Sequence, residues 1–136
     1  MPLPTPAQVL LTHLDWSIQH MQDSLNRPRT DYYRNAALQR FRFTFDLAVK
    51  TIAALGGETG ETCPSPAECF SLAERRGWSE DCKDLLSSFE KLTTLPLTQN
   101  AEEIYARLTV YHQFFRRLHA NLDRAIRSLP SQSNSV

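Results

Sequence analysis

The sequence is poor in glycine and cysteine and carries no excess charge of either sign. Its 136 residues include four glycines, three cysteines and 15 basic residues against 15 acidic ones. A formal net charge of zero argues against a general attraction of the whole domain to nucleic acid or to an anionic membrane, although a local basic face remains open. Scarce glycine, valine and isoleucine, with abundant leucine, alanine and glutamine, favour helix over strand. We therefore expect a single all-α domain.

Long apolar runs are also lacking. No segment approaches the roughly 18–20 consecutive apolar residues that span a bilayer. The first six residues, Met1 to Pro6, show neither the basic region nor the apolar region of a signal peptide. These absences predict a soluble, cytoplasmic protein without membrane contact.

The three cysteines, Cys63, Cys69 and Cys82, are odd in number and form no C-x-x-C pair. Neither a disulfide framework nor a zinc knuckle fits this pattern, so we expect reduced thiols. A catalytic cysteine is disfavoured because no histidine lies in the same segment and acidic neighbours raise the pKa of a thiol.

Two long amphipathic helices are predicted in the first half of the chain. The first begins at Pro6 behind an N-cap at Thr5 and ends before Asn26. The second is capped by Asp31 and stops at the glycine pair 56–57. Apolar residues in both helices recur at alternating spacings of three and four, which is typical of one buried stripe.

The second half of the chain predicts a broken third helix and a long last one. Ser65-Pro66 opens a short helix that ends before Gly77. A further helical piece starts at Ser79 and ends before residue 96, a proline. The last helix is expected to begin at Asn100.

The apolar stripes of these helices can be buried only by packing against one another, which predicts an up-and-down four-helix bundle with a broken third helix. We expect this domain to span residues 1–128 and a disordered tail to follow at 129–136. The predicted core consists of apolar residues from the first, second and last helices: Leu11, Leu14, Ile18, Met21, Phe41, Phe45, Ile52, Leu108, Phe115 and Leu122.

Residues 37–51, A-L-Q-R-F-R-F-T-F-D-L-A-V-K-T, resemble the Q-R-F-E-F-T-F-E-L-A-W-K signature of the nucleotidyltransferase substrate-binding family of the HEPN superfamily. Ser65-Pro66 and residues 101–108, A-E-E-I-Y-A-R-L, are similar to that family's S-P-R-E and A-E-E-I-Y-x-x-I segments, in the expected order. The resemblance extends from the first helix to Leu118. It implies a bundle of four to five helices, usually a homodimer, that works with a small, separately encoded nucleotidyltransferase. In several relatives the pair acts as a toxin–antitoxin module.

The resemblance also identifies a lost catalytic motif. Active HEPN ribonucleases have the catalytic motif R-x(4–6)-H. In this family the motif has roughly the sequence D-R-N-L-T-S-H-T-Y and precedes the last helix. The matching residues 89–97, F-E-K-L-T-T-L-P-L, place Glu90 at the arginine, Lys91 at the asparagine, Leu95 at the histidine and Leu97 at the tyrosine. The carboxylate of Glu90 cannot replace a phosphate-clamping guanidinium, and the aliphatic Leu95 cannot replace a general acid or base. We therefore expect no catalytic residues and no enzyme activity.

Four histidines form two pairs, His13 with His20 and His112 with His119. Residues seven apart share a helix face but lie about 10 Å apart along the axis, so one ion cannot bridge either pair. Antiparallel packing of the first and last helices would bring His13 toward His119 and His20 toward His112. The third and fourth ligands of a metal site are lacking, so we expect neither a metal nor a cofactor.

A candidate binding surface lies beside the core stripe of the second helix. Its residues recur at spacings of four, three and four, with two arginines nearby and a candidate ion pair between Asp46 and Lys50. This line is open to two interpretations: a solvated face with one partly covered phenylalanine, or a subunit or partner surface that includes a candidate nucleotide contact. The predicted site comprises Gln39, Arg40, Arg42, Phe43, Asp46 and Lys50.

The leading functional hypothesis is a non-catalytic binding subunit that dimerises and partners a small nucleotidyltransferase, helping to hold or present its substrate. One alternative is a HEPN-type ribonuclease toxin of a toxin–antitoxin pair, which the degenerate motif disfavours. Another is an orphan interaction domain that kept the dimer and lost its partner. A neighbouring reading frame with a G-S-x(n)-D-x-D pattern would distinguish the binding subunit from the orphan domain.

Overall fold

The computed structural model describes residues 3–94 and 97–129 and shows an all-α protein. Within these residues there are five helices and no strand. None of the helices in these two ranges is long and apolar enough to cross a membrane. In chain order the helices are α1 (Pro6–Leu25), α2 (Asp31–Glu58), α3 (Pro66–Arg75), α4 (Lys83–Thr94) and α5 (Leu97–Ser128).

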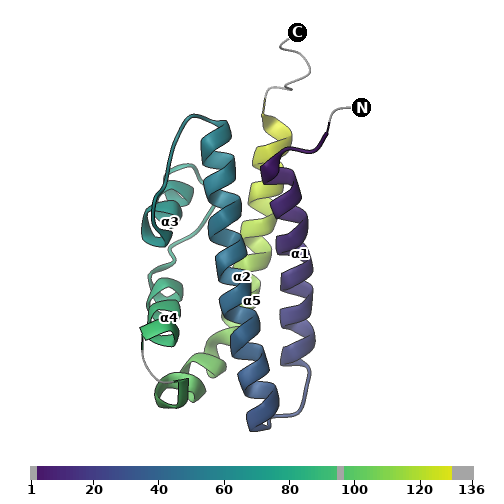
Figure 1. The fold of residues 1–136 in the computed structure, drawn as a ribbon, viewed down its shortest axis with the longest axis vertical. Helices are drawn as coiled ribbons and strands as arrows, with labels where there is room; N and C mark the ends of the chain where they lie inside the picture. Colours follow the sequence, from purple (N-terminus) through teal and green to yellow (C-terminus); the bar gives the residue numbers. More distant parts are fainter. Residues whose placement is uncertain (1–2, 95–96, 130–136) are drawn as a thin grey trace.

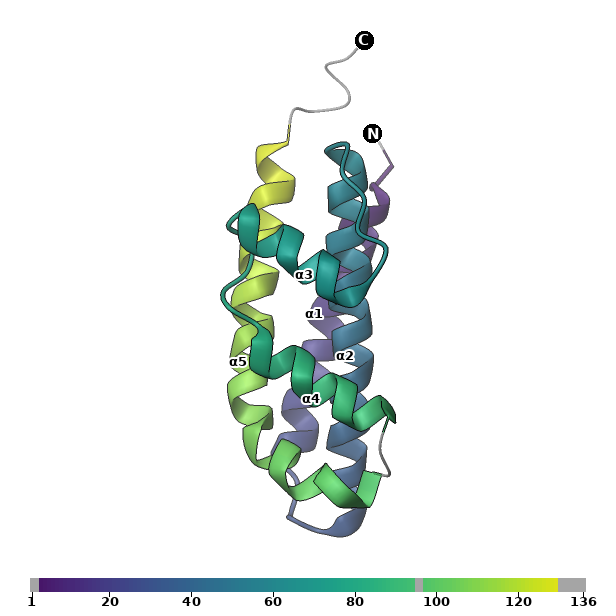
Figure 2. The same cartoon turned by 90° about the vertical axis from the view of Figure 1, so that its left-hand side faces the viewer.

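The three long helices, α1, α2 and α5, lie side by side along the long axis of the molecule (Figure 1). The chain runs along α1, returns along α2 and, after α3 and α4, runs along α5 antiparallel to α1. The short helices α3 and α4 lie one above the other and cross α2 and α5 on the side away from α1 (Figure 2). Helix α1 packs against α2 and α5, while α3 packs against α2 and α4 packs against α5 and α2.

Helix α1 has the predicted boundaries because both of its ends have capping residues. The N–H of Gln8 donates to the Thr5 hydroxyl at 3.2 Å, and the Thr5 N–H donates to the Gln8 side chain at 2.9 Å. Pro6 occupies the first turn, where its missing N–H costs nothing. The helix ends with Asn26 as its C-cap.

Helix α2 differs from the prediction at both ends. Its N-cap is Thr30 rather than Asp31, which instead occupies the first turn, where the helix dipole favours a negative charge. The helix also continues through Gly56 and its neighbouring glycine to Glu58. Gly56 serves close packing, because a Cβ there would lie only 2.9 Å from the Leu72 side chain of α3. The glycine after α2 that has a left-handed backbone is Gly60, at φ +87°.

Helix α3 begins and ends as expected, whereas α4 and α5 do not start where predicted. The Ser65 hydroxyl caps α3, and Gly77, at φ +76°, follows its end. Helix α4 starts at Lys83, whose N–H donates to the Asp81 carboxylate at 3.0 Å, and not at Ser79.

Helix α5 begins three residues before Asn100, the expected N-cap. No glycine or proline stands between residues 97 and 100, so nothing in this stretch interrupts a helix. The predicted disordered tail, apart from Leu129, lies outside the described residues.

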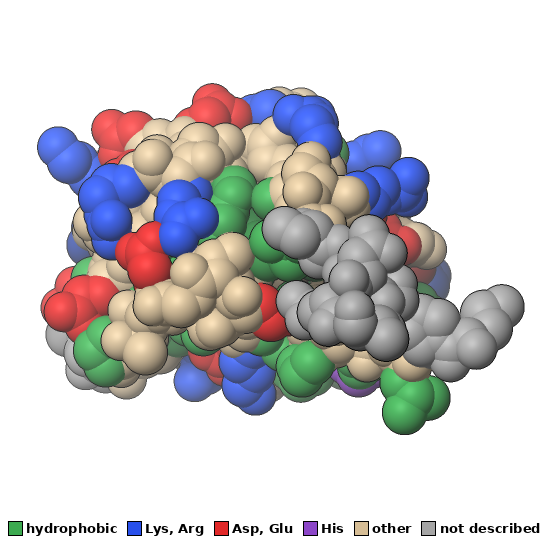
Figure 3. All heavy atoms as spheres, turned by 90° about the horizontal axis from the view of Figure 1, so that it is seen from above, with side chains coloured by type: hydrophobic (Ala, Val, Ile, Leu, Met, Phe, Trp, Pro, Cys, Tyr) green, Lys and Arg blue, Asp and Glu red, His purple; other side chains and the backbone are tan. Residues whose placement is uncertain are grey.

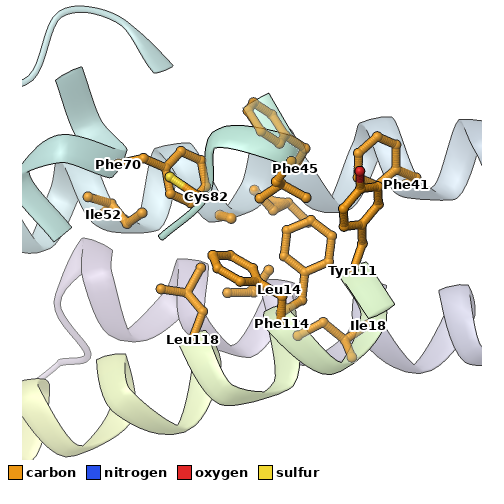
Figure 4. Packing of buried hydrophobic residues seen from close by; sticks show 14 of the residues in the cluster. Leu14, Ile18, Phe41, Phe45, Ile52, Phe70, Cys82, Tyr111, Phe114 and Leu118 are labelled. Atoms are coloured by element: carbon orange, nitrogen blue, oxygen red, sulfur yellow. The ribbon is translucent and has the colours of Figure 1, made fainter. Parts of the chain in front are cut away.

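All five helices contribute to one hydrophobic core. All ten residues predicted for the core are buried. Aromatic rings occupy its centre: Phe45 stacks on Phe89 of α4 with ring centroids 3.8 Å apart, and Phe70 of α3 lies 5.3 Å from Phe45. Phe41 stacks on Tyr111 of α5 at 5.3 Å (Figure 4). The short helices are therefore fixed to the long ones by aromatic contacts.

Two buried hydroxyl pairs join helices within this core. Ser17 of α1 and Thr44 of α2 have their oxygens 2.6 Å apart. Ser88 of α4 lies 2.6 Å from the hydroxyl of Tyr111, which also donates to the backbone carbonyl of Asp84 at 3.2 Å. Their polar atoms are thus paired, as buried polar groups require.

The expectation of three reduced thiols is wrong, because Cys63 and Cys69 form a disulfide with a Cα–Cα distance of 4.8 Å. The first turn of α3 carries Cys69 back over the end of the preceding linker, where it meets Cys63. An odd number of cysteines is compatible with one bridge and one free thiol, and Cys82 is the free, buried cysteine. Disulfides are rare in reducing compartments, so this bridge does not support the expectation of a cytoplasmic protein.

Candidate functional site

The candidate site is a groove of about 280 Å³ between α1 and α2. It is lined by four residues of α1 and three of α2: His13, Trp16, Ser17, His20, Arg40, Phe43 and Leu47. The Ser17–Thr44 contact fixes the two helices against each other at this position. Both walls therefore stand on well-packed elements.

The α1 residues that line the groove lie on one side of the helix because of their spacing in the sequence. His13, Trp16 and His20 are spaced three and four apart, so they form a line beside the core stripe. The rings of Trp16 and His20 meet edge to face with centroids 4.5 Å apart. This contact orders the indole ring while leaving it 68% exposed.

The groove combines exposed aromatic rings with a buried aliphatic side chain. Phe43 is 57% exposed, whereas Leu47, four residues later, is only 9% exposed. Aromatic side chains standing in solvent over a buried leucine form an apolar surface, and such surfaces mark contact with another molecule. Arg40 adds a cationic group to the same groove, and arginine and tryptophan are both frequent anchors of protein interfaces.

The predicted site residues do not all gather in this groove. Arg40 and Phe43 line it, while Gln39, Asp46 and Lys50 are exposed elsewhere on α2. Arg42 is two residues from Arg40, about 200° round the helix, so the two guanidinium groups leave the helix on different sides.

The expected ion pair between Asp46 and Lys50 does not form. Both residues are described, and no salt bridge within the described ranges joins them. Both side chains are therefore left to solvent in this structure.

Three further arginines at the start of α2 and just before it, which could also attract a phosphate, have partners elsewhere in the structure. Arg34 of α2 binds Glu102 of α5 at 2.5 Å, and Arg29 lies 3.9 Å from the same carboxylate. The guanidinium of Arg27 lies over the ring of Tyr33 at 5.9 Å. At the opposite end of the molecule, which bears the termini, basic and acidic side chains also lie interspersed on the surface (Figure 3).

The histidines do not pair as predicted. His13 and His20 line the α1–α2 groove, whereas His112 and His119 line a second groove, between α1 and α5. Burial lowers the pKa of His112, the nearby Arg116 charge lowers it further, and the backbone of Ile18 acts in the opposite direction. In the part of the chain that the structure describes, no group of three or more His, Cys, Asp or Glu side chains is placed to hold a metal ion.

The stretch that corresponds to the HEPN motif lies in α4 and just before α5. Glu90 is exposed on α4, and the ammonium of Lys91 lies 4.0 Å from the Glu103 carboxylate of α5. Leu95 lies outside the described residues, and Leu97 is the first residue of α5.

Trp16 and Leu47 are groove residues that were not predicted from sequence, and neither was the position of His13 and His20 next to α2. Trp16 carried a usable signal, because it lies on the same helical line as the two histidines but off the core stripe. No such signal singled out Leu47, which belongs to the groove only through the packing of α1 on α2.

A scan against protein-family models finds no match for this chain, and a search of curated proteins finds no similar sequence.

Proposed function

We propose that this protein is a non-catalytic binding subunit that docks a partner protein in the α1–α2 groove. The observation that carries the proposal is the exposure of Trp16 and Phe43 on facing helices, above the buried Leu47. The sequence resemblance of residues 37–51 supports a small nucleotidyltransferase as the partner and a homodimer as the working state. In this proposal α3 and α4 together correspond to the broken third helix of an up-and-down four-helix bundle.

Binding fits the groove better than catalysis does. Its two aromatic rings and one leucine supply contact area, and Arg40 supplies a charged anchor. Residues 89–97 contain neither arginine nor histidine, so the stretch corresponding to the ribonuclease motif lacks both the guanidinium that clamps the phosphate and the imidazole that acts as general acid or base. A ribonuclease toxin is therefore the weaker alternative.

The proposed partner surface has a size requirement. A specific interface buries at least about 1,000 Å² in total, with a few aromatic or arginine anchors near its centre. Trp16 and Phe43 are the exposed aromatic residues of the groove and Arg40 is its cation. We expect these three side chains to contribute most of the affinity.

The test compares single variants in binding to a nucleotidyltransferase encoded by a neighbouring reading frame with the G-S-x(n)-D-x-D pattern, and the absence of such a frame would contradict the proposed partner. Calorimetry should show that Trp16→Ala and Phe43→Ala each weaken binding about 30-fold, the effect of removing an interface anchor. Tyr32→Ala is the matched control, because Tyr32 is an aromatic residue 75% exposed on α2 that does not line the groove. Light scattering on the same proteins reports the oligomeric state.

A double charge reversal, Arg40→Glu with Lys50→Glu, tests the polar part of the surface. If folding, self-association and partner binding all survive both this variant and the two aromatic truncations, the groove is merely solvated and the proposal fails. Purified protein should also leave RNA intact. Cleavage that persists through purification and disappears on substitution of residues 90–95 would favour the ribonuclease instead.

A further inference from the structure

The second groove, between α1 and α5, is larger than the first and has a different chemistry. Its volume is about 560 Å³, and it shares no lining residue with the α1–α2 groove. Helix α1 contributes Asp15, Gln19 and Asp23 to its lining, and α5 contributes His112, Arg116 and His119. The spacings, four and four on α1 and four and three on α5, place each set on one helix face.

The two walls carry opposite charges that do not neutralise each other. No ion pair within 4.0 Å joins them in the described part of the chain. The Asp15 carboxylate accepts a hydrogen bond from Gln19 of its own helix at 3.0 Å. The guanidinium of Arg116 has neither an ion pair nor a side-chain hydrogen bond to any described residue. A free cation on α5 thus faces free acceptor capacity on α1.

This arrangement disfavours ligands of a single charge. An anion attracted by Arg116 enters a groove that also holds two carboxylates, and a simple cation attracted by those carboxylates enters a groove that also holds Arg116. A molecule that carries both kinds of group satisfies both walls, because a guanidinium binds a carboxylate with two parallel hydrogen bonds and a carboxylate accepts from an ammonium group.

The net charge of the groove indicates which type of zwitterion would bind there. In the formal charge count at pH 7, in which histidine contributes no charge, Asp15 and Asp23 outnumber Arg116 by one negative charge. The second carboxylate lies eight residues from the first, about 12 Å along the axis of α1. A ligand with one additional positive charge on a long side chain complements this surplus.

We propose that the α1–α5 groove binds a free basic amino acid, with the ligand carboxylate on Arg116, its α-ammonium on Asp15 and its side-chain cation toward Asp23. This site is separate from the proposed docking groove, and its ligand is a small molecule rather than a protein.

Calorimetry on the full chain at fixed ionic strength tests this assignment with three matched probes. L-arginine carries all three charged groups, agmatine lacks the carboxylate, and L-citrulline replaces the side-chain cation with a neutral group of similar shape. We expect saturable binding of L-arginine and binding at least about tenfold weaker for each of the other two, as the loss of a charge-assisted hydrogen bond requires.

Protein variants locate the site. Arg116→Gln and Asp15→Asn should each weaken L-arginine binding about tenfold. Arg124→Gln, an exposed arginine on the same helix outside the groove, should bind like the parent protein. Circular dichroism verifies that each variant retains its helices, and Trp16→Ala should bind L-arginine normally while losing the protein partner.

The proposal fails if L-arginine shows no saturable binding at concentrations on the order of 10 mM, where even a weak site is filled. It also fails if agmatine or L-citrulline binds as well as L-arginine, or if Arg124→Gln weakens binding as much as Arg116→Gln. Failure of the parent protein to bind the nucleotidyltransferase, with intact L-arginine binding, would instead count against the docking groove alone.

Discussion

Phe43 and Phe45 lie two residues apart on α2 and have opposite surroundings. Phe45 is completely buried among Phe41, Phe70 and Phe89, whereas more than half of Phe43 is exposed. Two residues turn the helix by about 200°, so one ring enters the core and the other leaves it. The periodicity of the sequence predicted this difference, and the structure confirms the burial of Phe45.

Replacing these two phenylalanines should have very different effects on stability. We expect Phe45→Ala to lower the free energy of unfolding by about 3–5 kcal/mol, because it removes a ring from a close-packed core and leaves a cavity. Phe43→Ala, the matched control on the same helix, should cost less than about 1 kcal/mol. Urea unfolding followed by circular dichroism measures both, and similar losses in the two variants would contradict the packing described.

Cys82 is a residue whose ionisation is linked to folding. Burial raises the pKa of its thiol to about 12, and the negative charges of Glu74 and Asp81 act in the same direction. The ordinary value for a thiol is 9.0. The sequence analysis expected acidic neighbours to raise a thiol pKa, and for this cysteine the direction is confirmed.

The raised pKa predicts an alkaline loss of stability. Between about pH 9 and about pH 12 the unfolded chain releases the thiol proton while the folded chain keeps it, so stability falls as the pH rises through this window. Below about pH 9 both states hold the proton and the contribution is constant. The decline in unfolding free energy across this window should be steeper for the parent protein than for Cys82→Ala. Equal slopes would show that the thiol ionises as readily in the folded state as in the unfolded one.

At the scale of the helix, α3 is the element that depends most on additional restraints. It has only ten residues, too few to be stable in isolation. The Ser65 cap fixes its start, the Cys63–Cys69 disulfide ties it to the linker, and Phe70 anchors it in the core. Removing one of these restraints should destabilise the protein without unfolding it.

Reduction of the disulfide should lower the free energy of unfolding by about 2 kcal/mol. The bridge closes a loop of sequence separation six, and a short loop constrains the unfolded chain only modestly. Urea unfolding with and without a phosphine reductant measures the difference. In Cys63→Ala the reductant should have no effect, whereas Cys82→Ala should respond like the parent protein. A reductant-insensitive parent protein would mean that the bridge contributes nothing.

The helix boundaries show which features can be predicted from sequence. Thr5 and Ser65 were identified as caps because their signals lie within four residues of the helix start. Gly56 was misread as a helix end because its role depends on Leu72, which approaches it from another helix. The disulfide was missed for a similar reason, since the distance between Cys63 and Cys69 depends on how the linker packs against the first turn of α3.

At the scale of the whole molecule, one core connects all five helices, so we expect them to unfold together. Trp78, which follows α3, is buried in this core, while Trp16 is exposed. In a Trp16→Phe variant, fluorescence therefore reports the α3–α4 region, whereas circular dichroism reports mainly the three long helices. Coincident transitions in urea are expected, and an earlier fluorescence transition would show that α3 and α4 unfold separately.

The candidate site was only partly predictable, because it is a property of packed helices. Phe43 and Arg40 were found from their place beside the core stripe of α2. Gln39, Arg42, Asp46 and Lys50 were grouped with them from proximity in sequence, but they do not line the groove. The α1 wall required knowledge of how α1 packs on α2, which periodicity within one helix does not contain.

The buried contact between Ser17 and Thr44 also bears on how the chain chooses among alternative alignments of α1 and α2. Thr44 donates its proton to the Arg40 carbonyl at 2.7 Å, so its oxygen accepts the proton of Ser17. An apolar stripe alone would tolerate sliding by one turn, about 5.4 Å, with little loss. Such a slide would leave the Ser17 hydroxyl without its acceptor, at a cost of about 1–3 kcal/mol if it stays buried. This pair of hydroxyls therefore favours the observed register, and with it the facing positions of Trp16 and Phe43.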